Sequence, residues 1–185
     1  MRKIVLTFGL ISGAIMSALM ALTIPFQHRL GLDAGMVIGY TTMVAASLLI
    51  YFGVRRYRDT VGGGRVSFGR ALALGLLIAA VAGACYTATW EAIYFSGSGR
   101  AFTASYQEAA LAKARRSGAT PAQLEAQRAE LAAWAVRYEN PLINSAFTFL
   151  EPLPVGLLVS LISAGVLSRR AKRRPGEGME LAGVA

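Results

Sequence analysis

Four long apolar runs constrain this chain more than any other feature. They cover residues 4–24, 36–54, 71–95 and 142–167, and each has about the 20 residues that a helix needs to cross a bilayer. Because lipid offers no partners to backbone polar groups, such runs must form helices. We therefore expect an all-α integral membrane protein with four transmembrane helices, forming a single domain over residues 1–174.

A polar segment, residues 100–140, separates the third and fourth runs. It is rich in Ala, Glu, Lys and Arg, which favour helix, and Gly118 interrupts it. Thr120, Pro121 and Gln123 then form the pattern of a capped helix start. The segment predicts a helical hairpin. Beyond the last run, residues 175–185 predict a disordered cytoplasmic tail.

The basic residues predict the orientation. The formal net charge is +9, but the basic residues gather at the ends of apolar runs, which argues against nucleic acid as a partner. Twelve of the 19 Lys and Arg lie in the N-terminus, residues 55–70 and the segment after residue 167. The positive-inside rule places both termini in the cytoplasm and the hairpin outside. The first run also fits a signal peptide, but it is longer than a signal core and lacks a good cleavage site, so a retained helix is favoured.

The composition argues against several common types of catalytic and metal site. Cys85 and His28 are the single cysteine and histidine, so thiolate metal sites, most zinc sites and a Ser-His-Asp triad are not expected. Gly62-Gly63-Gly64 lacks the Gly-Lys-Ser/Thr ending of a phosphate loop and predicts a flexible connector. We expect no catalytic residue, cofactor or metal, and no enzyme.

Two acidic residues, Glu91 and Glu151, lie inside the apolar runs. At 1.5 Å per residue, Glu91 lies about 6 Å from the outer end of its helix and Glu151 about 14 Å. Glu91 can extend to the interface, whereas Glu151 cannot do so easily. An ionisable group at membrane depth marks a candidate functional site.

Two prolines follow Glu151 and support the hypothesis of a site at this position. Pro152 and Pro154 lack an N–H, so the carbonyls of Thr148 and Leu150 lose their helical partners. The candidate intramembrane polar site comprises Glu151, Glu91, Thr148, Pro152 and Pro154. Two interpretations stay open: a structural kink in which Glu151 bonds a hydroxyl such as that of Thr41, Thr42 or Thr87, or a site for a proton, a cation or a small polar substrate.

The second hairpin helix carries one apolar face. This candidate docking face consists of Leu124, Leu131, Trp134 and Tyr138. Packing on the first hairpin helix is its simplest use. Contact with another membrane or periplasmic protein, or with the membrane surface, is the alternative.

The order of motifs resembles a family of small bacterial membrane proteins called domain of unknown function 4199. The motifs that carry the resemblance are Lys3-Ile4-Val5, Gly9-Leu10-Ile11, Gly13, Gly39-Tyr40, Tyr57-Arg58-Asp59, Gly63-Gly64, residues 67–72, Gly118-Ala119-Thr120, Asn140-Pro141 and residues 149–157. The resemblance covers nearly the whole chain. It implies four membrane helices and no activity.

Two functions follow as hypotheses. The leading one is a non-enzymatic interaction or structural membrane protein whose hairpin docks another protein. The alternative is a small transporter or a proton or cation relay that uses Glu151, with a homo-oligomer as a further expectation.

Overall fold

The computed structural model describes residues 1–168, apart from the side chains of residues 27–30 and 32. This part of the chain is helical. Its elements are α1 (Arg2–Thr23), η1 (Ile24–Phe26), α2 (Gln27–Thr60), α3 (Phe68–Phe95), α4 (Ser98–Arg116), α5 (Pro121–Tyr138), α6 (Pro141–Leu150) and α7 (Leu153–Leu167). The predicted tail, residues 175–185, lies outside the described residues.

Four helical stretches are long and apolar enough to cross a membrane, as the sequence predicts. They run over Arg2–Phe26, Asp33–Thr60, Phe68–Phe95 and Pro141–Leu167. Helical hydrogen bonding continues past the apolar runs into polar residues, so most helices are longer than expected. The helix α2 even begins at Gln27, with a non-helical residue, Gly31, inside it.

The third helix, α3, lies at the centre of the bundle and packs against α1, α2, α6 and α7. Small residues allow the close approach. A Cβ added to Gly9 would lie 2.6 Å from the Val81 side chain, and one added to Gly13 would lie 2.6 Å from Cys85 Cβ. Small residues at helix interfaces are typical of membrane bundles, where van der Waals packing holds the helices together.

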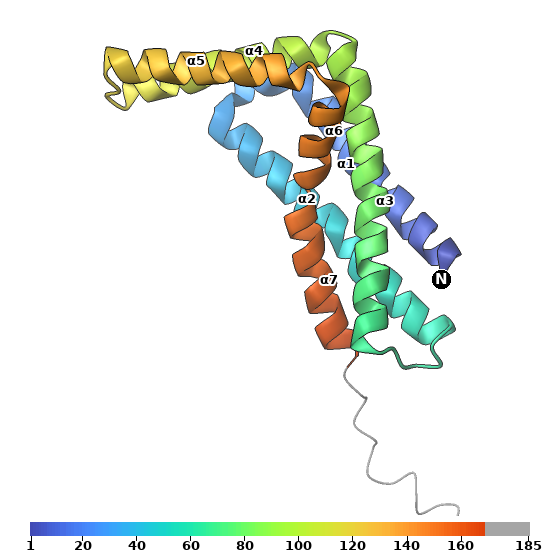
Figure 1. Ribbon diagram of the computed structural model, residues 1–185. Coiled ribbons are helices and arrows are strands. Elements are labelled where there is room, and N and C mark those ends of the chain that lie inside the picture. Colours follow the sequence, from blue (N-terminus) through green and yellow to red (C-terminus); the bar gives the residue numbers. More distant parts are fainter. Residues whose placement is uncertain (169–185) are drawn as a thin grey trace, which may run out of the picture.

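The polar segment folds into the predicted hairpin of α4 and α5. Gly118 turns the chain with a φ of 86°, and Thr120 and Gln123 form the predicted capping box. The hairpin lies crosswise over one end of the bundle (Figure 1), whereas the N-terminus, the α2–α3 loop and the end of α7 lie toward the opposite end.

The last membrane stretch is broken in its middle. The helix α6 ends at Leu150 and α7 begins at Leu153, because Pro152 and Pro154 remove two helical hydrogen bonds. The predicted interruption at Glu151 is therefore present, and it separates the half of the stretch near the hairpin from the other half (Figure 1).

Candidate functional site

A cavity of about 440 Å³ lies between the bundle and the hairpin. Residues of α1, α2, α3 and α6 form its walls, and residues of α4 and α5 line it from the hairpin side. Its lining is rich in methionine and aromatic side chains. The aromatic members are Tyr40, Tyr86, Trp90, Phe102, Tyr106, Trp134 and Tyr138.

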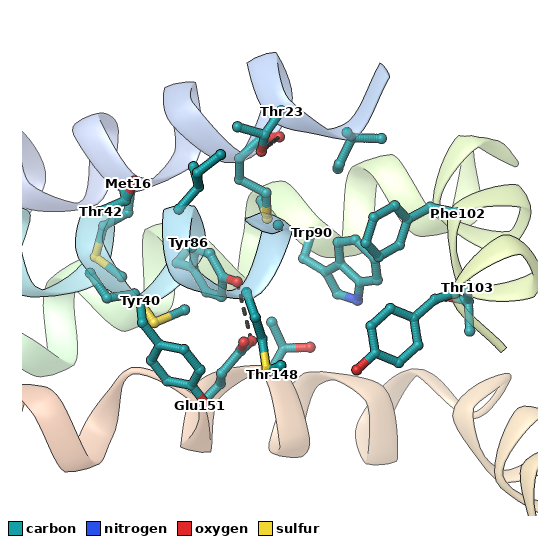
Figure 2. A pocket seen from close by; sticks show the side chains of 18 of the residues that line it. Met16, Thr23, Tyr40, Thr42, Tyr86, Trp90, Phe102, Thr103, Thr148 and Glu151 are labelled. Atoms are coloured by element: carbon teal, nitrogen blue, oxygen red, sulfur yellow. Dashed lines mark hydrogen bonds between the residues drawn. The ribbon is translucent and has the colours of Figure 1, made fainter. Parts of the chain in front are cut away.

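Glu151 provides the carboxylate of this cavity. The Tyr86 hydroxyl of α3 donates a hydrogen bond to Glu151 Oε2 at 3.1 Å, and Figure 2 shows the two side chains reaching toward each other across the cavity. Glu151 is an exposed residue, because the break between α6 and α7 presents it to the open space. The partner is thus Tyr86 rather than one of the three threonines expected from the sequence.

A buried amide beside the cavity holds three elements together. Asn144 of α6 is fully buried. Its Oδ1 accepts from Trp90 Nε1 at 3.0 Å and from Thr148 Oγ1 at 3.3 Å, and its Nδ2 donates to the Tyr138 carbonyl at 3.2 Å. Buried polar groups are costly unless bonded, so this network fixes how α3, α5 and α6 meet.

Tyr138 extends this network to the hairpin. Its hydroxyl lies 3.2 Å from Thr148 Oγ1. Since the single hydroxyl proton of Thr148 is directed at Asn144, the Tyr138 hydroxyl is the donor. Burial raises the pKa of Tyr138 above its ordinary value, so this donor keeps its proton over the physiological pH range.

An ion pair closes the base of the hairpin. Arg100 Nη2 lies 2.8 Å from Glu139 Oε2, and Arg100 Nε lies 2.9 Å from Oε1, while the Tyr94 hydroxyl donates to Oε1 at 3.1 Å. The Arg100 guanidinium also lies over the rings of Tyr94 and Phe95. Its hydrogen bonds lower the pKa of Glu139 below the usual value.

The residues of the predicted docking face make contacts with both the hairpin and the bundle. Trp134 packs edge-on against Phe147 with ring centroids 4.9 Å apart, and Tyr138 packs against Tyr94 at 5.5 Å. Leu124 and Leu131 are half-buried, and Gln107 Nε2 of α4 donates to the Leu131 carbonyl. Trp134 and Tyr138 line the cavity together with Thr148 and Glu151, whereas Leu124 and Leu131 do not.

The other members of the predicted polar site lie outside the cavity lining. Pro152 is buried and Pro154 is exposed. Glu91 is half-buried, and its Oε1 is buried without a hydrogen-bond partner among the described residues. Glu91 does not join Glu151 in the cavity, so the structure does not form a carboxylate pair there.

Comparison with known proteins gives the family. A family model described as "Protein of unknown function (DUF4199)" matches residues 7–169. The chain belongs to this family. Neither the curated proteins nor the solved structures gave a match. The DUF4199 match spans every residue that lines the cavity, and its description names no activity, so function must be argued from the site.

The chemistry of the site suits binding. Among the described residues, no group of three or more His, Cys, Asp or Glu is placed to hold a metal ion. Glu151 and Tyr86 supply one polar anchor in walls that are otherwise mainly apolar. Binding sites for small molecules have this character: a concave, mostly apolar surface of about 300–1,000 Å³ with a few placed polar groups.

Proposed function

We propose that this protein is a non-enzymatic membrane protein that binds a small amphipathic ligand in the cavity beneath the hairpin, as a carrier or transporter would. The observation that carries the proposal is the Glu151–Tyr86 hydrogen bond inside the 440 Å³ cavity. A carboxyl group in the middle of a membrane-spanning stretch costs stability. A ligand-binding role explains why this carboxyl group lies at a helix break beside a cavity.

The position of α2 supports entry from the membrane. Gly35, Gly39 and Met43 follow one another at every fourth residue of α2, so they share one face, and all three line the cavity. Two neighbouring lining residues on the same helix are exposed, Met36 at 47% and Tyr40 at 51%. They lie within Asp33–Thr60, a stretch long and apolar enough to cross a membrane, and we propose that a ligand dissolved in lipid enters beside them.

Docking of another membrane or periplasmic protein on the hairpin is the second candidate function. Trp134 is 36% exposed and Val136 is 76% exposed, which leaves apolar surface on α5. The geometry supports this function less, because Trp134 and Tyr138 contact the bundle. A photo-crosslinker at position 134 that captured one dominant foreign protein in cells would favour docking over ligand binding.

For location, we propose a bacterial cytoplasmic membrane with both termini in the cytoplasm and the hairpin outside. The basic residues near the N-terminus and in the α2–α3 loop support this orientation. In a Cys85→Ala background, Ser117→Cys should react with an impermeant maleimide added to intact cells, and Val61→Cys should not. The reverse labelling pattern would refute the orientation.

Filling the cavity tests the binding function. Space is open around Gly39, since a Cβ added there meets nothing within 4 Å. We expect Gly39→Leu to weaken saturable binding of a neutral fluorescent probe, N-phenyl-1-naphthylamine, by about tenfold or more, because the new side chain takes up volume in the pocket. Fluorescence titration of the purified protein in an uncharged detergent measures this.

Gly165→Leu is the matched control. Gly165 also has open space around it, but it lies on α7 outside the cavity lining. This variant should bind the probe like the unaltered protein. Equal binding by both leucine variants and the unaltered chain would refute a ligand site in this cavity.

A further inference from the structure

We infer that the ligand is a lipophilic cation: an amine, quaternary ammonium or similar group carrying apolar substituents. This inference rests on the proposed binding function and specifies the chemical class of the ligand. It depends on the formal charge of the cavity, on its aromatic walls and on its methionine-rich lining.

The described lining of the cavity carries negative charge only. Among the described residues that line it, Glu151 alone carries a formal charge, and none is a Lys, Arg or His. Tyr86 donates one hydrogen bond to this carboxylate. No cationic side chain among the described residues lines the cavity beside this carboxylate, and in a region of low dielectric an opposite charge interacts with it far more strongly than in water.

The walls suit a cation better than a neutral polar molecule. Seven aromatic side chains line the cavity, two of them tryptophans. Aromatic faces attract ammonium groups, tryptophan most strongly, and such cages recognise quaternary ammonium ligands. The Trp90 Nε1 donor is already directed at Asn144, so its ring contributes mainly its apolar face and edge.

The remaining lining favours apolar substituents of varied shape. Met16, Met20, Met36 and Met43 come from α1 and α2. Methionine side chains are flexible and polarizable, and they adapt to irregular ligands. Few polar groups would be left to bind a sugar or a peptide, and an anion would meet the Glu151 carboxylate.

A pair of probes of nearly equal size and opposite charge tests the inference. Tetraphenylphosphonium is the cation and tetraphenylborate is the anion. The full chain is purified in an uncharged detergent, and binding is measured by equilibrium dialysis against protein-free micelles. We expect saturable binding of tetraphenylphosphonium and no binding of tetraphenylborate above the micelle blank.

Substitution of the carboxylate provides the decisive comparison. Glu151→Gln should weaken tetraphenylphosphonium binding by about tenfold or more, in line with loss of an interaction to a charged group. Glu108→Gln, which removes the charge of an exposed residue of α4 outside the cavity lining, should leave it unchanged. Retained binding of the neutral probe by Glu151→Gln would show that this variant is folded.

The outcomes separate the two proposals. Equal binding of tetraphenylphosphonium by Glu151→Gln and the unaltered protein, or equally tight binding of tetraphenylborate, overturns the cationic class of ligand. The binding function still stands in that case if Gly39→Leu blocks the neutral probe. If Gly39→Leu affects neither the neutral probe nor tetraphenylphosphonium, both proposals fail together.

Discussion

At the scale of single residues, a few side chains determine the site. Glu151 was found from the sequence because a carboxylate in an apolar run stands out. Tyr86 was missed, because a tyrosine in the middle of a membrane stretch has no distinguishing pattern. Its hydrogen bond to Glu151 joins positions 65 residues apart, and that pairing depends on how α3 and α6 pack.

Asn144 is the residue whose loss should cost most stability in the wall of the cavity. Asn144→Leu keeps the number of side-chain heavy atoms but leaves Trp90 Nε1 and the Tyr138 carbonyl without their bonded partner. We expect a loss of about 1–3 kcal/mol, the cost of leaving buried polar groups unpaired. Thermal unfolding in detergent, followed by near-ultraviolet circular dichroism, measures this.

Ser145→Ala serves as the comparison for Asn144→Leu. Ser145 neighbours Asn144 on α6 and is half-buried. Its substitution should change the melting temperature little. If the two variants unfolded at the same temperature as the unaltered protein, the Asn144 network would not be what holds the cavity wall.

At the scale of elements, the sequence predicted which segments are helical but not how they are placed. The capping pattern at Thr120 and the turn at Gly118 define the hairpin locally. Its crosswise position depends on contacts between distant segments, such as the Lys113–Asp33 ion pair between α4 and α2 and the Arg100–Glu139 pair. The apolar face of α5 stays a predicted docking face, and the contacts of Trp134 with α6 and of Tyr138 with α3 follow only from this placement.

The Arg100–Glu139 pair should make the hairpin sensitive to acid. The pKa of Glu139 is lowered in the folded protein. The ionised carboxylate therefore stabilises the hairpin base fully at pH values above 4.5, the usual pKa of this side chain. That contribution is lost as the pH falls below 4.5 and through the folded-state pKa. Limited proteolysis of the α4–α5 segment should therefore accelerate on acidification from pH 6 to pH 3, measured with a protease active across that range.

Glu139→Gln supplies the control for the acid effect. The amide keeps the size of the side chain but cannot titrate, so its cleavage rate should already be raised at pH 6 and should change less on acidification. An identical pH profile in both proteins would assign the acid effect to other carboxylates.

At the scale of the whole molecule, a four-helix bundle carries a hairpin that covers a cavity at one end. The two candidate sites expected from the sequence, the intramembrane polar site and the face of α5, contribute to one cavity through Glu151, Thr148, Trp134 and Tyr138. The sequence could not show this. Periodicity places residues on a helix face, but it does not specify which faces of distant helices meet.

The most direct test of a ligand site beneath the hairpin is photolabelling with a diazirine-bearing hydrophobic amine, followed by peptide mapping of the adducts. We expect labels in segments 36–43, 86–90 and 148–151, and competition by excess tetraphenylphosphonium. Labels spread over the exposed apolar surface of α7, such as Leu158 and Ile162, without competition would contradict the account.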